Sequence, residues 1–200
     1  MLFAIKIFDV PDSGPLRDIH REAHLDYLKG FDAQTLFAGP FLTQDLKTEL
    51  GSHRMIEFDN LAAAEQHVAD EPYITGGVQN GYTIHEWLPD TANSWRDCPR
   101  AEGNVQFMIE AMLAPDVTAV PEGMGLGREA FLRNCAANII TSGWLLDQGE
   151  AAVGTLMILD VPDLAAAEAI WNAEPLRAAG LYSEINFYGW RFGRVLDRFK

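Results

Sequence analysis

The sequence is short of basic residues, of cysteine and of long apolar runs, and each shortage excludes a class of protein. Lysine and arginine total 15 against 29 aspartate and glutamate residues, which gives a formal net charge of −14 at pH 7. A surface of this sign repels nucleic acid, because phosphate binding depends on lysine and arginine displacing counterions. We therefore expect no nucleic-acid partner.

Cysteine occurs only as Cys98 and Cys135, without the spacing of a metal knuckle or the number needed for a disulfide framework. Residues 1–8 lack the basic start of a secretory signal, and Pro11 interrupts the apolar run that follows. No segment approaches the roughly 20 apolar residues that a membrane-spanning helix needs. These features predict a cytoplasmic protein with no membrane partner.

What the chain does contain is one pattern written twice. Residues 61–65 recur as 164–168, and Glu71-Pro72 recurs as Glu174-Pro175, each shifted by 103 positions. A unit of about one hundred residues present twice is a duplicated domain, because solenoid periods run from roughly 20 to 50 residues and need about three copies. We predict domains at 1–90 and 103–193, joined by a polar, proline-containing linker over 89–103.

Each copy is predicted to follow the order β-α-β-β-α-β. In the first copy the predicted elements are strands at 3–8, 35–38, 52–58 and 82–87, with helices near 15–30 and 61–69. We expect Gly39-Pro40 to end the second strand, and in the second copy we expect the first helix near 126–137. This order is ferredoxin-like.

The predicted strands carry apolar side chains on both faces, which indicates that neither face of the sheet is fully wet. The second copy is the obvious cover for the face that bears no helices. The predicted fold class is α+β, with two ferredoxin-like (βαββαβ) repeats packed as an intrachain pseudo-dimeric α/β barrel.

The five histidines all lie in the first copy; they are His20, His24, His53, His67 and His85. His24 stands in the stretch 21–25, whose best match in the second copy, 128–132, has Phe131 in its place. A histidine on the shoulder of an apolar helix face either reaches a cleft or bonds a backbone carbonyl. His20 and His24 also have the i, i+4 spacing of metal ligands, but no further ligand is signalled, so we predict no metal and no cofactor.

Several motifs of the first copy resemble the YCII-related (YciI-like) family over residues 1–88. They are Arg21-x-x-His24-Leu25, Ala38-Gly39-Pro40, Gly51-Ser52, the helix 61–64 and Glu71-Pro72-Tyr73 before Gly77. The resemblance implies membership of the dimeric α/β-barrel superfamily and a site centred on a histidine and an acidic residue. In some members it implies dehalogenating or lyase-like chemistry on hydroxylated aromatic rings. Residues 105–191 look like a second, diverged copy.

The resemblance assigns the family's histidine to His24 and its acidic residue, normally an aspartate, to Glu71. Asp70, next to it, is an alternative. In the second copy Phe131 removes the base while Glu174 remains. The motifs suggest Gly39, Ser52 and Tyr73 as substrate-binding residues, although Ser52 also fits a structural role.

A His/Glu pair without an adjacent nucleophile suits general acid–base catalysis. We predict a small cytosolic acid–base enzyme, a lyase, isomerase or dehalogenase-like protein, that acts on a compact cyclic or aromatic metabolite. The alternative is a non-catalytic small-molecule-binding or accessory module whose site has decayed. A pocket lined by Phe131 and Trp144 would favour binding, whereas a solvent-connected His24 touching Glu71 would favour catalysis.

Because the two copies can cover each other within one chain, we expect a monomer that is a pseudo-dimer of its halves, or at most a weak homodimer. Analytical ultracentrifugation over a dilution series, with circular dichroism at each step, is expected to show monomers that keep their secondary structure. Loss of structure on dilution to the monomer would contradict this prediction.

Overall fold

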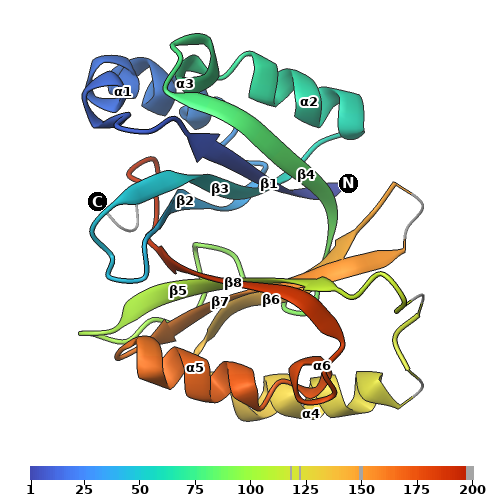
Figure 1. Ribbon diagram of the computed structural model, residues 1–200. Helices are drawn as coiled ribbons and strands as arrows, with labels where there is room; N and C mark the ends of the chain where they lie inside the picture. The colour runs from blue at the N-terminus through green and yellow to red at the C-terminus, as the bar shows by residue number, and fades with distance from the viewer. Residues whose placement is uncertain (118, 122, 149–150, 197–200) are drawn as a thin grey trace. The chain divides into compact units, whose positions relative to one another are not determined.

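The computed structural model describes the chain except for residues 118, 122, 149–150 and 197–200 (Figure 1). The chain divides into two compact units. The first comprises Met1–Trp87 together with the segment that begins at Arg191, and the second comprises Leu88–Trp190. Among the described helices, none has the length and apolar character needed to span a bilayer.

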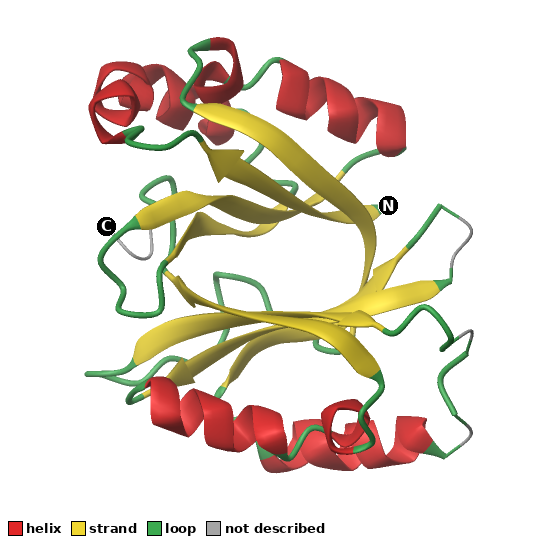
Figure 2. Ribbon diagram, viewed as in Figure 1, coloured by secondary structure: helices red, strands yellow, loops and turns green. Residues whose placement is uncertain are grey.

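The first unit is a four-stranded antiparallel sheet with helices on one face (Figure 2). Its strand order is β4-β1-β3-β2. The elements are β1 (Leu2–Asp9), α1 (Gly14–Lys29), β2 (Thr35–Leu42), β3 (Glu49–Glu57), α2 (Leu61–Ala69), α3 (Pro72–Thr75) and β4 (Gln79–Pro89).

The second unit has the same element order and the same kind of sheet, with strand order β6-β7-β5-β8. Its elements are β5 (Val105–Leu113), α4 (Met124–Asn134), β6 (Ile139–Leu146), β7 (Ala152–Val161), α5 (Leu164–Asn172), α6 (Pro175–Ala178) and β8 (Tyr182–Trp190). The predicted α+β class with two ferredoxin-like repeats is confirmed, and the structure adds a one-turn helix before the last strand of each unit.

Three details differ from the sequence-based expectation. β2 continues through Gly39-Pro40, because Pro40 pairs with Ser52 in an outer strand of this sheet, where a missing N–H is tolerated. α4 ends at Asn134, three residues before the predicted end. The segment predicted as a linker belongs to the second unit, where the Asp90 N–H donates to the Ser142 carbonyl at 2.8 Å.

The core of the first unit lies between the sheet and α2. Alternate residues of β1 face the helices, and Ala64 and Val68 of α2 pack against them. The buried cluster consists of Phe3, Ile5, Ile7, Ile56, Phe58, Ala64 and Val68. Ala64 has no exposed surface, so its small side chain lets the helix approach the strands closely.

One polar ring, that of His67 on α2, lies inside this apolar layer. It packs against Phe31 and Phe58, with ring centroids 4.4 and 5.0 Å away. Arg54 donates to its Nε2 at 2.9 Å, which leaves the proton on Nδ1, 3.2 Å from the Tyr27 hydroxyl. Burial and the charge of Arg54 lower the pKa of His67 from 6.5 to about 3. The ring is therefore neutral in the folded protein at neutral pH.

This neutral histidine predicts a pH-dependent stability. Between pH 6.5 and about 3 the unfolded chain protonates His67 and the folded chain does not, so stability falls as pH falls. One such proton corresponds to about 1.4 kcal/mol of unfolding free energy per pH unit. His67→Gln is expected to reduce the slope of unfolding free energy against pH by up to about this amount between pH 6 and 4.5, measured by urea unfolding.

Asn60→Ala is the matched control, because Asn60 accepts from Ala63 N–H at 3.0 Å and caps the same helix. It is expected to cost about 1 kcal/mol at every pH and to leave the slope unchanged. Equal slopes for wild type and His67→Gln would contradict the assignment.

Candidate functional site

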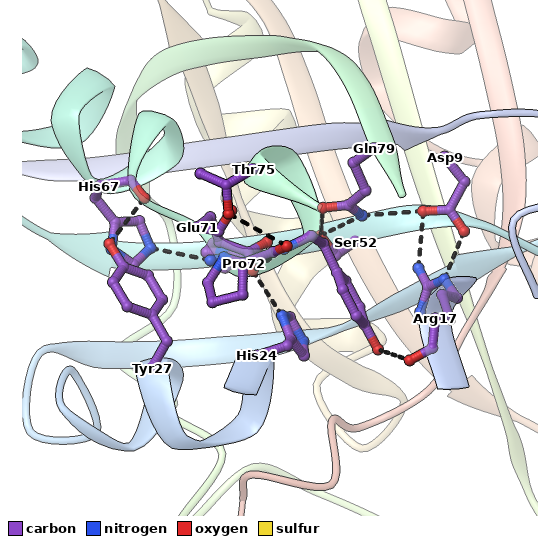
Figure 3. Close-up of polar contacts among 12 residues, drawn as sticks. Asp9, Arg17, His24, Tyr27, Ser52, His67, Glu71, Pro72, Thr75 and Gln79 are labelled. Carbon is purple, nitrogen blue, oxygen red and sulfur yellow. Dashed lines mark hydrogen bonds and ion pairs between the residues drawn. The ribbon is translucent and has the colours of Figure 1, made fainter. Parts of the chain in front are cut away.

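A histidine and a glutamate meet beneath the helices of the first unit. Nδ1 of His24, on α1, lies 2.8 Å from Oε1 of Glu71, although 47 positions separate them in the chain (Figure 3). Glu71 has no exposed surface and His24 keeps 8%. The two side chains that the family resemblance pairs are therefore within hydrogen-bonding distance.

The local sequence around Glu71 explains where its carboxylate points. Glu71 is the N-cap of α3, with extended backbone, and Pro72 follows as the first helical residue. Oε1 accepts the Tyr73 N–H at 3.0 Å as well as the contact from His24. One oxygen thus caps a helix and holds the imidazole, which restricts the carboxylate to a single orientation.

The ring of Tyr73 fixes the plane of the imidazole. It stacks on His24 with ring centroids 3.9 Å apart and planes within 5°. The Tyr73 hydroxyl is itself held, since it donates to the Arg17 carbonyl at 3.4 Å.

The electrostatics favour a neutral imidazole beside a charged carboxylate. Burial lowers the pKa of His24 below its ordinary value, although Glu71 acts in the opposite direction. For Glu71, burial raises the pKa, but the hydrogen bond to His24 and the charge of Arg54 lower it to about 2. At neutral pH, Nδ1–H therefore donates to the carboxylate, and Nε2 is left as a basic nitrogen.

Arg54, in the middle of β3, ties this pair to the rest of the sheet. Its guanidinium lies 3.4 Å from Oε2 of Glu71 and donates to Ser52 Oγ at 3.2 Å. Gln79 also donates to Ser52 Oγ, at 3.1 Å. These bonds keep a positive charge beside Glu71 and occupy the lone pairs of the serine hydroxyl.

A cavity of about 140 Å³ opens in front of His24 within the first unit. One wall is formed by α1 and Tyr73, another by Ala38, Gly39 and Pro40 of β2. A third wall is Arg191–Val195, here called the strap.

The strap is fixed to β2 by two backbone bonds. Arg191 N–H donates to the Pro40 carbonyl at 3.2 Å and Gly193 N–H to the Ala38 carbonyl at 2.8 Å. A side chain at Gly39 would meet the Arg191 carbonyl oxygen at 1.8 Å, so only glycine admits the strap this closely.

The predicted site residues lie close together, but not all of them line the cavity. His24, Gly39, Ser52 and Tyr73 line the cavity, whereas Glu71 lies behind His24 and does not. The contacts indicate that Gly39 admits the strap, that Ser52 belongs to the Arg54 network and that Tyr73 orients His24.

Asp70 and His20, the two alternatives raised from the sequence, have contacts away from the pair. Asp70 is exposed and accepts a hydrogen bond from Gln66, so it does not replace Glu71. His20 packs over Gly76. Within the described residues, no group of three or more histidine, cysteine, aspartate or glutamate side chains is arranged to hold a metal ion.

A cluster of arginines at the cavity is what the sequence did not predict. Five line the cavity: Arg17, Arg21, Arg54, Arg191 and Arg194. Glu49 binds Arg17 and Arg191 with its two oxygens, each at 2.6 Å. Arg54 had a signal, since it follows Ser52 at strand spacing inside an apolar strand. The strap arginines had none, because nothing in the sequence connects residue 191 with residue 39.

The second unit corrects one expected correspondence. The turn after α4 and the turn after α1 close with equivalent bonds, Asn138 N–H to the Cys135 carbonyl and Gln34 N–H to the Phe31 carbonyl. The offset there is 104, so the counterpart of His24 is Arg128, and the match of 21–25 with 128–132 is out of register. Arg128 lies 2.8 Å from Glu174, as His24 does from Glu71.

Comparisons with known proteins agree with this architecture. No curated protein matches the chain significantly. A solved 5-chloro-2-hydroxyhydroquinone dehydrochlorinase from Burkholderia phenoliruptrix, in complex with 2,5-dihydroxybenzoquinone, is 26% identical; the match covers 47% of this chain and 100% of that chain, with a TM-score of 0.44.

Chlorite dismutase from Candidatus Nitrospira defluvii is 9% identical over 99% of this chain and 94% of its own, with a TM-score of 0.64. A putative monooxygenase from Lactobacillus acidophilus is 13% identical over 96% and 93%, with a TM-score of 0.54. These likenesses extend over both units, are to proteins of dimeric α/β-barrel fold, and show the fold alone. The family model of the YCII-related domain matches residues 1–88, which lie in the first unit.

Proposed function

We propose that the first unit is an acid–base enzyme, a lyase, isomerase or dehalogenase-like catalyst acting on a compact cyclic or aromatic metabolite. The observation that carries the proposal is the contact of His24 with a fully buried Glu71 at the wall of a cavity. The contact of His24 with Glu71, together with the place of His24 in the cavity lining, supports catalysis over binding alone.

In the proposed reaction His24 is the base. Its Nδ1–H is bound to Glu71, so Nε2 accepts a proton from a substrate carbon next to a carbonyl group. Glu71 keeps its negative charge, stabilises the imidazolium that forms and holds the ring in place. The imidazolium then returns the proton to another substrate atom or to a leaving group, which completes an isomerisation or an elimination.

The match of residues 1–88 to the YCII-related domain guides the search for a substrate. The resemblance implies chemistry on hydroxylated aromatic rings in some members, so hydroxyquinones and unsaturated lactones are the first classes to screen. Spectrophotometric turnover of one of these by the intact protein, lost in His24→Ala, is the test. A substrate whose turnover survives His24→Ala would contradict the proposal.

With a substrate in hand, the pH profile separates a catalytic pair from a structural one. The neutral imidazole is the active form, so kcat/KM is expected to rise with pH and level off at an inflection below 6.5. His24→Ala is expected to lower turnover by about 10² or more. Glu71→Gln is expected to lower kcat and to move the inflection to lower pH, because Glu71 raises the pKa of His24.

Asp70→Asn is the matched control, since it removes the same charge from the neighbouring, exposed position. It is expected to change neither kcat nor the inflection. An unchanged inflection in a folded Glu71→Gln variant would show that the glutamate acts only as a helix cap.

The second unit is expected not to supply a site. Phe131→His, added to His24→Ala, should not restore turnover, because the group beside Glu174 is the guanidinium of Arg128. Burial acts to lower the pKa of Arg128, but the charge and the hydrogen bond of Asp90 act to raise it, and the pKa lies above its ordinary value. Turnover measured for the double variant, against His24→Ala alone, checks this. Recovery of activity would place a working site in the second unit.

A further inference from the structure

One equivalent position carries a glycine in the first unit and an aspartate in the second. Gly193 N–H binds the carbonyl of Ala38, and Asp90 N–H binds the carbonyl of Ser142. Ala38 pairs with Arg54, and Ser142 pairs with Met157. Arg54 and Met157 are 103 positions apart, so Ala38 and Ser142 hold equivalent places in the two sheets. Gly193 and Asp90 are also 103 apart, so they are counterparts.

In the second unit the side chain at this position is an anion bound inside the protein. The Asp90 carboxylate lies 2.7 Å from a guanidinium nitrogen of Arg128 and accepts the Ser142 hydroxyl at 3.1 Å. The Arg128 guanidinium also lies over the ring of Trp144, 4.8 Å from its centroid, where the first unit has Pro40. Arginine, aspartate and tryptophan together occupy the region that corresponds to the first cavity.

The first unit lacks all three groups and has a cavity instead. His24 is shorter than arginine, Pro40 is smaller than tryptophan, and Gly193 has no carboxylate. Positive charge nevertheless remains there, because Arg21 and Arg194 line the cavity. Within the part of the chain that the structure describes, Arg194 forms no ion pair and Arg21 pairs with the exposed Asp18 on its own helix.

This retained charge is unusual in a chain with net charge −14. Five of its fifteen basic residues line one cavity, and Glu49 is the only carboxylate among the described residues that line it. Glu49 is already shared by Arg17 and Arg191. Guanidinium groups bind carboxylates and similar planar anions through paired hydrogen bonds.

We propose that the cavity in front of His24 binds an organic anion, whose charged group takes the place held in the second unit by the Asp90 carboxylate, beside Gly193 and within reach of Arg21 and Arg194. In the second unit the anion is the carboxylate of Asp90, a part of the chain, whereas the first unit binds an anion from solution. The proposed function places the reacting carbon of this anion at His24, and the inference rests on it for that step alone.

The experiment is a calorimetric titration of the intact protein at pH 7 with benzoate, and with benzamide as its neutral isostere. Benzoate is expected to bind more tightly than benzamide. Arg194→Ala and Arg21→Ala are each expected to weaken benzoate binding by about tenfold and benzamide binding by less than about twofold, as for loss of a charge-assisted hydrogen bond. Arg133→Ala is the charge-matched control, because Arg133 is exposed in the second unit, and it is expected to change neither.

A second pair of variants tests the position of the charged group. Gly193→Asp and Gly193→Asn both place a side chain 2.9 Å from the Ala38 carbonyl oxygen, so they share any steric effect. Gly193→Asp is expected to abolish benzoate binding, because it restores the carboxylate of the second unit, and Gly193→Asn is expected to retain more of it. Equal losses would overturn the placement beside Gly193.

The experiments distinguish failure of the anion inference from failure of the acid–base proposal. Equal affinity for benzoate and benzamide, or no binding of either, would overturn the anion inference and leave the acid–base proposal standing. Benzoate binding that depends on Arg194, in a protein whose turnover survives His24→Ala, would support the anion site and overturn the acid–base proposal.

Discussion

A carboxylate that loses all contact with water needs partners for both of its oxygens, and the site of the first unit is arranged around this requirement of Glu71. One oxygen receives the Tyr73 amide and the His24 imidazole, and the other faces Arg54. Removing one partner from a buried charge costs far more than the pair contributes in net stability, so the arrangement is retained as a unit. The contacts that give His24 a fixed tautomer are the same contacts that let the protein keep Glu71 buried.

The second unit meets the same requirement with a different partner, and its chemistry changes with it. Arg128 supplies a permanent positive charge and further donors, which satisfy Glu174 and Asp90 together. A guanidinium has no acceptor and does not lose its proton in proteins. Histidine satisfies its glutamate with one nitrogen and keeps a lone pair on the other. One residue, at equivalent positions of two similar units, therefore decides whether the glutamate is paired with a side chain that can accept a proton or with one that cannot.

Much of the fold and part of the site could be predicted from the sequence. The offset of 103 and the strand and helix periodicities predicted two ferredoxin-like units, because these signals are local or repetitive. The contact of His24 with Glu71 was predicted through the family motifs.

The predicted register of the first helix in the second unit was wrong. The prediction aligned 21–25 with 128–132 because four of the five residues are identical, although this alignment makes the connection to the next strand three residues shorter than in the first unit. A hydrogen-bonded turn of fixed length decided the correct register. The strap was missed for a different reason, since a segment that completes a distant cavity through backbone bonds leaves no pattern in its side chains.

Because of the strap, the order in which the two units are synthesised differs from the order in which their structures are completed. Chains fold largely from the N-terminus as they are synthesised. Residues 1–87 can form their sheet and bring His24 to Glu71 early, but the wall contributed by Arg191–Val195 exists only after the whole second unit has been translated. The unit that is synthesised first thus acquires its complete cavity last, and a chain interrupted anywhere in its second half carries the histidine pair without the enclosure around it.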